Sequence, residues 1–379
     1  MAKSHYDYII VGNGLAGLKL ALAFSNDSYF DTKSIALIDH SNKTTNDKTW
    51  SYWDNNSNKN SLTCKSWKKA FIYTYNTKTE LNLEPYNYNT IKSIDFYNYA
   101  IKVLKSKQNF HFIIDDIISI SEANTVEVSS KTALYTAIHV FDSRLTDEMK
   151  IEFNNAISIT QHFKGWIIKT KDDVFDDQSV TIMDYRIKDK NKTTFNYVLP
   201  FSKNEALVEF TYFNDTVVKE NVYDHFIETY IKDYLNISDF EIIETEIGQI
   251  PMTNFRFEQF NTTKITKIGT AGGWVKASTG YSFKLTDKKV KVIVENIKSN
   301  QLPSRGLDNK KYKFYDKVFL KVLKDENYKG EWIFHRFYTK NSIQTMFRFL
   351  DEESTFLEEL KIMFSLFSWS FIKAFFKTL

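Results

Sequence analysis

The chain has 379 residues, which is more than one compact hydrophobic core usually holds and is enough for two domains. Its 50 Lys and Arg residues nearly balance 47 Asp and Glu residues, and no basic block is present, which argues against nucleic acid as a partner. The single cysteine, Cys64, excludes an internal disulfide and a cysteine-rich metal site.

The N-terminal segment predicts a strand, a glycine turn, a helix and a second strand. Residues 6–11 form a short run typical of a buried strand, and the following stretch has helical spacing at Leu15, Leu18 and Leu22. Residues 34–39 form a second run of this kind. These elements fit within the roughly 30 residues of a βαβ unit, so a parallel sheet is expected at the N-terminus.

The turn of this unit carries the GxGxxG pattern of a dinucleotide site. Its first glycine permits the tight turn, the second lets a pyrophosphate approach the backbone, and the third lets the helix pack on the strand. The pyrophosphate is expected on the free N–H groups at the positive end of the helix. Asp39 ends the second strand, 22 residues after Gly17, where a carboxylate can bind ribose hydroxyls. The predicted cofactor contacts are Gly12, Gly14, Leu15, Ala16, Gly17 and Asp39, with a ligand-free glycine turn as the alternative.

The middle of the chain predicts mainly extended structure. Residues 67–83 are expected as strands and residues 88–105 as an amphipathic helix, before short strands return in residues 110–144. Strand-like segments dominate residues 157–213, which predicts an antiparallel sheet inserted between parts of the nucleotide domain. Further along, we expect a helix at 222–235, a buried strand at 265–270 and mostly helices after 285.

A second glycine cluster follows the strand predicted at residues 265–270. Two separated glycine turns fit FAD better than a nicotinamide dinucleotide, because the long flavin molecule reaches from one turn to the other. Without the first turn, the second cluster would be as typical of a purely structural turn as of a flavin-binding turn. The FAD interpretation adds the cofactor contacts Gly269, Thr270, Ala271, Gly272 and Gly273.

Several motifs occur in a fixed order along residues 7–360. They are VGNGLAGL, KTWSYWD, FDSR, QHFKGW, IMDYR, YVLPFSKNEALVEFTYF, IPMT, IGTAGGWVKASTGYSF and FRFLDEESTFLEELKIMF. In this order they resemble the lycopene cyclase family of carotenoid biosynthesis, and the segments with GTAGG, STGY, LPFS and VEFT are the most specific. The resemblance implies a lycopene beta-cyclase, an isomerase that closes the linear ends of lycopene into β-rings, giving gamma-carotene and then beta-carotene.

The resemblance also implies the cofactors and the catalytic acid. The family uses non-covalent FAD that must be reduced although the reaction is redox-neutral, with NAD(P)H as the reductant. Its catalytic acid is a glutamate of an E-x-T motif, which here matches LVEFT and assigns that role to Glu209. Many relatives have a second acidic residue where this chain has Phe210, so the motif does not identify the base that removes the final proton.

The residues around Glu209 suit a carboxyl group that keeps its proton. Leu207, Val208, Phe210 and Tyr212 flank it, and burial among apolar groups disfavours the charged form of a carboxyl. A surface glutamate on an antiparallel strand is the alternative. The side chains expected to shape the substrate cavity are Trp53, Trp274, Tyr281 and the pair Asp184 and Arg186, with core packing and a structural salt bridge as the alternatives.

The C-terminal region predicts helices and a tail at the membrane surface. The solvated side of one helix is expected to carry Asp351, Glu352, Glu353, Glu358 and Glu359. Residues 363–379 are rich in Phe and Trp with sparse Lys, which favours an interfacial helix, with a packed terminal helix as the alternative. No run approaches the ~20 apolar residues of a spanning helix, and residues 1–7 lack a secretory signal. We therefore expect a cytoplasmic protein, peripheral to the inner face of the membrane.

Together these elements predict a mixed α/β fold with three regions. A Rossmann-type FAD-binding domain with a parallel sheet is expected in residues 1–65, 106–155 and 256–300. An inserted antiparallel-sheet substrate domain is expected in residues 66–105 and 156–255, and a helical C-terminal region in residues 301–379. The alternative functions are an FAD-dependent monooxygenase or polyprenyl reductase acting on an apolar isoprenoid, and a flavin-bound carotenoid carrier without turnover. The sequence leaves the oligomeric state open.

Overall fold

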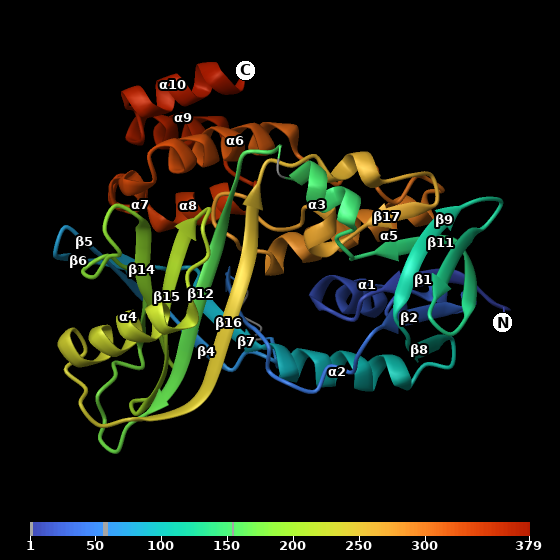
Figure 1. Cartoon of the computed structure of the whole chain (residues 1–379), viewed down its shortest axis with the longest axis horizontal. Coiled ribbons are helices and arrows are strands. Elements are labelled where there is room, and N and C mark those ends of the chain that lie inside the picture. The colour runs from blue at the N-terminus through green and yellow to red at the C-terminus, as the bar shows by residue number, and fades with distance from the viewer. Residues whose placement is uncertain (1–2, 56–59, 154) are drawn as a thin grey trace.

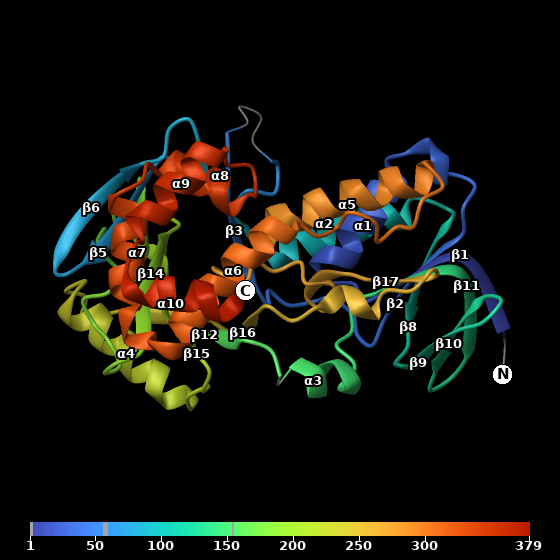
Figure 2. The same cartoon turned by 90° about the horizontal axis from the view of Figure 1, so that it is seen from above.

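The computed structural model describes residues 3–55, 60–153 and 155–379. Figures 1 and 2 show two halves, each built on a large sheet, with the last helices of the chain covering one of them. Residues 1–2 of the N-terminal segment discussed above lie outside the described residues. Within the described ranges, no helix combines the length and apolarity needed to cross a bilayer.

The first sheet contains the predicted βαβ unit. Strands β8, β2, β1, β11 and β17 run parallel, and β10 and β9 extend the sheet antiparallel beyond β11. Strand β2 is buried along its whole length, which explains its uninterrupted apolar sequence before Asp39. The predicted mixed α/β fold with a Rossmann-type parallel sheet is thus confirmed. The strands are β1 Lys3–Val11, β2 Ile35–Asp39, β8 Phe110–Ile114, β9 Ile117–Glu122, β10 Val126–Ser130, β11 Leu134–Asp142 and β17 Ile265–Lys267.

Helices α1, α2 and α5 pack together on one face of the first sheet. Alternate residues of the parallel strands, such as Ile10, contact these helices, and intervening residues, such as Ile9, contact β9 and β10. Buried Lys19 links α1 to α5, because its Nζ lies 2.8 Å from the carboxylate of Asp287. The helices of this half are α1 Leu15–Ser25, α2 Ser93–Lys105, α3 Asp147–Phe153 and α5 Phe283–Lys298.

The helix predicted over residues 88–105 begins at Ser93, and its first residues belong to a strand instead. Strand β7 pairs with β3 and β4 in a small sheet, and its Tyr88 and Ile91 are fully buried, so tertiary packing overrides the helical spacing there. Helix α2 contacts α1 and β8, so it lies on the first sheet, although residues 66–105 were assigned to the substrate domain. The remaining domain boundaries stay predictions. The small sheet comprises β3 Thr49–Asp54, β4 Lys65–Trp67 and β7 Asn87–Lys92.

The second sheet has the strand order β16-β12-β15-β14-β13-β5-β6 and is antiparallel except between β13 and β5. Helix α4 (Glu220–Asp233) packs on one face, against residues such as Phe210, and the C-terminal helices pack on the other, against residues such as Leu207. Strand β16 was not predicted. The strands are β5 Lys69–Thr74, β6 Thr77–Asn82, β12 Ser158–Lys169, β13 Ser179–Asp184, β14 Thr193–Pro200, β15 Glu205–Asn214 and β16 Glu241–Thr253.

The C-terminal residues form the expected helices, which cover the second sheet (Figures 1 and 2). Helix α10 packs on α6 and buries its small residues Ser370, Ala374 and Thr378, whereas its Trp369 and Phe376 are exposed. The tail is therefore a packed helix that still presents large apolar side chains to its surroundings. The helices are α6 Lys310–Asp325, α7 Gly330–Thr339, α8 Ile343–Leu350, α9 Phe356–Ser365 and α10 Trp369–Thr378.

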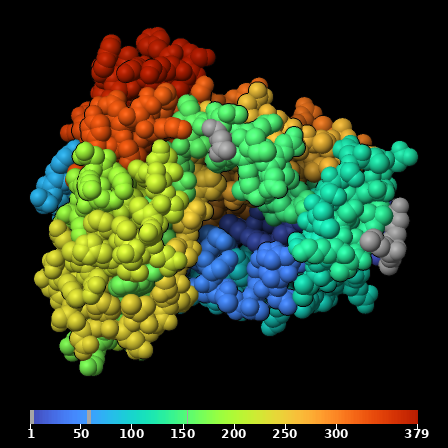
Figure 3. All heavy atoms as spheres, in the orientation of Figure 1, coloured from blue at the N-terminus to red at the C-terminus, as the bar shows by residue number. Residues whose placement is uncertain are grey.

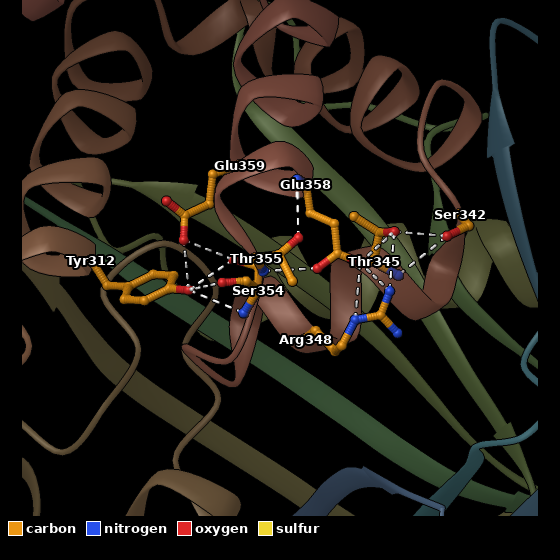
Figure 4. A network of polar contacts seen from close by, with 8 residues as sticks. All are labelled: Tyr312, Ser342, Thr345, Arg348, Ser354, Thr355, Glu358 and Glu359. Atoms are coloured by element: carbon orange, nitrogen blue, oxygen red, sulfur yellow. Dashed lines mark hydrogen bonds and ion pairs between the residues drawn. The ribbon is translucent and has the colours of Figure 1, made fainter.

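The acidic residues at and before α9 do not form the solvated helix face that we expected. Glu359 is fully buried and accepts a hydrogen bond of 3.0 Å from the hydroxyl of Tyr312. Glu358 pairs with Arg348 and completes the capping box at the start of α9. Figure 4 shows both glutamates turned toward these partners. Asp351 is buried as well, so several of these carboxylates hold the helices together instead of facing solvent.

Candidate functional site

A cavity of about 520 Å³ lies between the first and second sheets. It begins at the first glycine turn, where Gly14 and Gly17 line it, and extends to strands β15 and β16, where Glu209 and Glu246 line it. Figure 3 shows a hollow bordered by yellow, green and blue atoms, with dark blue atoms of the N-terminal residues at its back. One continuous space thus joins the predicted cofactor turn and the predicted acid.

The first glycine turn leaves the N-terminus of α1 open toward the cavity. Gly14 is the N-cap residue, so no side chain caps α1, and the first turn of α1 has no acidic residue. A Cβ at Gly14 would meet no described atom beyond its chain neighbours within 4 Å, whereas a Cβ at Gly17 would lie 2.0 Å from the carbonyl oxygen of Gly12. Because free N–H groups at the positive end of a helix bind phosphate, this turn fits a pyrophosphate.

The second glycine turn lies directly against the first. Gly269 has a φ of +61°, and a Cβ there would lie 3.1 Å from the Cβ of Ala16. Gly273 ends the 3-10 helix Gly269–Gly272 in the left-handed conformation, with a φ of 67°. Gly269 and Thr270 line the cavity, whereas the cavity wall does not include Ala271, Gly272 or Gly273. The two turns thus meet beside the cavity. Ala271, Gly272 and Gly273 belong to the second turn but do not line the cavity.

Asp39 supports the first glycine turn from the end of β2. Its carboxylate accepts hydrogen bonds from the backbone N–H groups of Asn13, at 2.6 Å, and Ser41, at 3.1 Å. It also pairs with Lys43 at 3.3 Å. Asp39 is buried and is not among the residues that line the cavity. The structure therefore shows Asp39 holding the turn in place, and its contact with a ribose stays a prediction.

Several buried polar atoms on the cavity wall have no hydrogen-bond partner in the described part of the chain. Leaving such an atom unpaired in a dry protein interior costs about 1–3 kcal/mol. The atoms are Thr49 Oγ1, Gln161 Oε1, Glu246 Oε2, Trp274 Nε1 and Thr279 Oγ1.

Glu209 is the buried carboxyl group at the end of the cavity remote from the glycine turns. It is 7% exposed and accepts a hydrogen bond from the hydroxyl of Thr211, two residues along the strand. Burial, reinforced by the nearby carboxyl of Glu246, raises the pKa of Glu209 to about 8. A carboxyl group with this pKa holds a proton at neutral pH and is able to act as a general acid.

A second buried glutamate, Glu246 on β16, faces the same cavity. Glu209 and Glu246 are both directly opposite Gly165, which lies on the intervening strand β12. A Cβ at Gly165 would lie 2.8 Å from Leu207 Cδ1. Leu207 therefore occupies the space above this glycine, and a larger residue would not fit there. Glu246 Oε1 accepts a hydrogen bond of 3.0 Å from the backbone N–H of Thr49. Burial raises the pKa of Glu246 to about 7, and we call Glu209 and Glu246 the carboxyl pair.

Three tyrosines form the wall beside Glu209, of which Tyr88 is buried and Tyr197 and Tyr281 are partly buried. The hydroxyl oxygen of Tyr88 lies 2.8 Å from that of Tyr197 and 2.9 Å from that of Tyr281. Tyr197 is directly opposite Glu209 on β14 and donates a hydrogen bond of 2.8 Å to Ser51 Oγ. Burial raises the pKa of all three tyrosines well above its usual value, so they remain neutral hydrogen-bonding groups.

Two of the aromatic residues predicted for the substrate cavity line it, and one does not. Trp274 and Tyr281 lie on the wall. Trp53 lies behind Tyr281, with ring centroids 4.9 Å apart, and stacks on Phe347 at 4.5 Å. Trp53 therefore supports the wall and has no contact with the cavity itself, because Tyr281 stands between them.

Asp184 and Arg186 do not line the cavity, contrary to our expectation. They form an ion pair on the α4 side of the second sheet, where the hydroxyl of Tyr230 donates a hydrogen bond of 2.7 Å to Asp184. The guanidinium of Arg186 also lies 4.0 Å from the ring centroid of Tyr73. The residues just before them, Ile182 and Met183, face the cavity instead. The pair is thus the structural salt bridge that we considered as the alternative.

Glu246, Tyr88 and Tyr197 are cavity residues that the sequence reasoning did not single out. Glu246 lies on the unpredicted strand β16, and Tyr88 lies on β7, which was predicted as helix. The available signal for Glu246 was its place shortly before IPMT, one of the motifs that support the family resemblance. Nothing in the local sequence indicates that Glu246 and Glu209 lie in the same row of a sheet.

The raised pKa of Glu209 predicts a pH-dependent stability. Its carboxyl titrates near its ordinary value of 4.5 in the unfolded chain and near about 8 in the folded protein, so its contribution is complete below pH 4.5 and is lost as the pH rises to about 8. Each pKa unit is worth about 1.4 kcal/mol. We expect the free energy of unfolding of the wild type to fall by a few kcal/mol between pH 5 and pH 8, and that of the Glu209→Gln variant to show no such fall. Urea unfolding measures both.

Glu205→Gln is the matched control, because Glu205 lies on the same strand and does not line the cavity. It should keep the pH dependence of the wild type. An equally steep loss of stability in the Glu209→Gln protein would contradict a protonated, buried Glu209.

Several solved structures have the same fold as this chain. A geranylgeranyl bacteriochlorophyll reductase-like protein from Thermoplasma acidophilum has a TM-score of 0.64 at 12% identity, with 100% of both chains covered. A flavoprotein/dehydrogenase from Cytophaga hutchinsonii has a TM-score of 0.59 at 11% identity, covering 95% of this chain and 99% of that chain. The halogenase PltM, solved in complex with phloroglucinol and FAD, has a TM-score of 0.59 at 12% identity, covering 92% and 82%. Identities this low show the likeness of fold alone.

The sequence comparisons identify the family. A search of curated proteins gave no match. The family described as lycopene cyclase protein matches residues 7–375, which includes both glycine turns, Glu209 and the C-terminal helices up to α10. The chain therefore belongs to the lycopene cyclase protein family.

Proposed function

We propose that this protein is a lycopene beta-cyclase, which uses reduced FAD to convert lycopene into gamma-carotene and then beta-carotene. The observation that carries the proposal is that Glu209, a buried carboxyl group whose pKa is raised to about 8, lies in the same cavity as both glycine turns. A proton donor in dry, apolar surroundings suits the addition of a proton to an alkene. Membership of the lycopene cyclase protein family supports a carotenoid as the substrate.

The proposed FAD site uses both glycine turns. The free N–H groups of Gly14 to Gly17 hold the pyrophosphate, and the turn at Gly269 and Thr270 borders the same space. Gln161 and Trp274 line the same cavity and border the proposed position of the flavin ring. When bound, reduced FAD supplies negative charge that stabilises a nearby carbocation, and NAD(P)H is the proposed source of its electrons.

In the proposed reaction, Glu209 donates its proton to the terminal double bond of lycopene. The neighbouring double bond attacks the resulting tertiary carbocation, which closes the ring, and loss of a proton leaves the ring double bond. Tyr197 and Tyr281 border this space with their hydroxyl groups tied to Tyr88. Their rings help exclude water and attract a cation through their quadrupoles.

A second cavity of about 300 Å³ suits the long apolar remainder of a carotenoid. It lies among the C-terminal helices, and Thr279 lines both this cavity and the one that contains Glu209. The proposed path of a linear polyene runs from Glu209 past Thr279 toward α9 and α10. Its wall is almost entirely apolar and includes Phe314, Phe319, Phe337, Ile362, Phe371 and Phe375.

The outer surface of α9 and α10 is the proposed contact with the membrane. Phe356, Leu357, Phe364 and Trp369 are 69% exposed or more, although each is a large apolar side chain. Exposed Lys residues at 361, 373 and 377 alternate with them, which suits anionic lipid headgroups. A water-insoluble substrate would enter between these helices, so attachment there brings the apolar cavity to the lipid. This is the proposed basis of a peripheral position on the cytoplasmic face.

The alternative enzymes give products of different mass. Cyclisation leaves the mass of lycopene unchanged, a polyprenyl reductase adds two hydrogen atoms per reduced bond, and a monooxygenase adds oxygen. A carotenoid carrier returns lycopene unaltered in retention time as well as mass. Pigment extracted from lycopene-accumulating cells that express the protein separates these outcomes.

The cofactor proposal is tested with Gly14→Val. Gly14 has a φ of −83°, and open space surrounds its Cβ position, so valine is tolerated by the fold but occupies the approach of the pyrophosphate. We expect wild type to retain or take up FAD, with a flavin absorption spectrum, and the variant to lose it at an unchanged unfolding temperature. Ser28→Val, at an exposed position after α1, is the control that should keep FAD. A colourless wild type that cannot be reconstituted with FAD would overturn the proposal.

The catalytic acid is tested with Glu209→Gln, which keeps the shape of the side chain but has no proton to give to an alkene. We expect cyclisation of lycopene to fall by at least ~10²–10⁴-fold, as for loss of a general acid, while FAD remains bound. Glu209→Asp should retain a trace at most, because its carboxyl is withdrawn by one methylene. The control Glu205→Gln should match wild type. Beta-carotene formation by Glu209→Gln at the wild-type rate would exclude this glutamate as the acid.

Membrane attachment is tested by replacing Phe356, Leu357, Phe364 and Trp369 together with serine. None of the four lines the apolar cavity, so substrate binding should survive. Each large apolar side chain transferred into lipid contributes ~1.5–3 kcal/mol, so binding to anionic vesicles should fall by more than ~10²-fold in flotation assays. The control replaces the exposed residues Ile118, Ile138 and Ile151 of the other half with serine. If the variant with four serines on α9 and α10 floats with vesicles as wild type does, these side chains are not the membrane contact.

A further inference from the structure

We propose that Glu246 is the proton acceptor that completes each cyclisation, so that the carboxyl pair both supplies and recovers the proton. This inference rests on the proposed cyclase function and extends it, because the E-x-T motif identifies one acid and no base. It assigns a chemical task to a glutamate on β16, which lies outside that motif.

The register of the second sheet places the carboxyl pair on either side of Gly165. Each glutamate is directly opposite this glycine, so their Cα atoms lie about 9–11 Å apart. Both side chains line the cavity. The end of a carotenoid held in this cavity would therefore lie beside both carboxyl groups.

Glu246 has one oxygen fixed and the other available. Oε1 is held by the backbone N–H of Thr49, and Oε2 is buried without a hydrogen-bond partner among the described residues. A carboxylate on a cavity wall that has one oxygen without a donor has the capacity to accept a proton from a bound molecule. The hydrogen bond from the backbone of Thr49 holds the carboxyl group in one position on the cavity wall.

The charges around the pair favour one shared proton at neutral pH. The charged groups near Glu246 are Glu209 on β15, Glu244 on its own strand, and Lys48 and Asp47 before β3. Burial raises both pKa values, that of Glu209 to about 8 and that of Glu246 to about 7. Two interacting carboxyl groups lose their protons in sequence, so the state that combines neutral Glu209 with ionised Glu246 exists near neutral pH.

The proton balance closes over one cycle. Glu209 gives its proton to the terminal double bond, forming a C–H bond, and the next double bond closes the ring with its electron pair. Ionised Glu246 then removes a proton from the carbon beside the cation, and the electrons of that C–H bond become the ring double bond. The proton passes from Glu246 back to Glu209, so the reaction consumes no proton and no electron.

The test is Glu246→Gln, assayed for lycopene cyclisation as a function of pH with FAD bound. We expect wild type to show a bell-shaped profile, with Glu246 responsible for the fall at low pH and Glu209 for the fall at high pH. The rate of the Glu246→Gln variant should be at least ~10²-fold lower than that of wild type, and its profile should lack the fall at low pH, which we call the acid limb. Glu246→Asp should have a higher rate than Glu246→Gln and should show part of the acid limb. A readout without turnover is urea unfolding, where Glu246→Gln should reduce the loss of stability between pH 5 and pH 7.

Glu244→Gln is the matched control, because Glu244 lies two residues earlier on the same strand and does not line the cavity. It should keep the wild-type rate and both limbs of the pH profile, with the low-pH limb moved slightly to lower pH because the charge of Glu244 raises the pKa of Glu246. A Glu246→Gln protein with wild-type rate and an intact acid limb would overturn the inference and leave the cyclase proposal standing. Loss of rate with the acid limb intact and FAD released would also overturn it, since it indicates a structural role. A wild type that forms no ring would overturn both proposals.

Discussion

Two carboxyl groups are buried on the wall of one cavity, and they cannot both be ionised there without a large cost in free energy. In the described part of the chain neither Glu209 nor Glu246 forms an ion pair, and neutral groups donate to them, Thr211 to Glu209 and the backbone of Thr49 to Glu246. One proton therefore stays within the pair near neutral pH. Acid chemistry on a substrate as unreactive as an isolated alkene depends on such a retained proton.

The second sheet provides this arrangement through its register. Gly165 on β12 is directly opposite both glutamates, and Tyr197 on β14 continues the same row on the other side of Glu209. Hydrogen bonds between four neighbouring strands fix the row, so the groups are held without a mobile loop. The first sheet meets this row from across the cavity with the two glycine turns, which places the proposed flavin and the proposed acid in one space.

The C-terminal helices combine structural and surface roles. Ile362, Leu366 and Ala374 belong to the core that covers the second sheet, while nearby Phe364 and Trp369 are exposed. Removing the tail would open that core, and for this reason surface substitutions are the cleaner way to separate membrane attachment from folding. The same helices enclose the apolar cavity, so the packing that stabilises them also shapes the proposed path for a long polyene.

The sequence by itself determined the local features: the βαβ unit, both glycine turns, the apolar setting of Glu209 and the helical C-terminus. Each of these follows from residues that are neighbours in the chain, where periodicity, turn chemistry and motif spacing act directly. The tertiary structure alone decided that Tyr88 lies on a strand, that Asp184 and Arg186 face α4, and that Glu359 is buried. It also decided that Glu246 lies opposite Gly165. Strand register and burial arise from contacts between segments that are distant in the chain. A short stretch of sequence does not indicate which face of its own strand or helix those segments will cover.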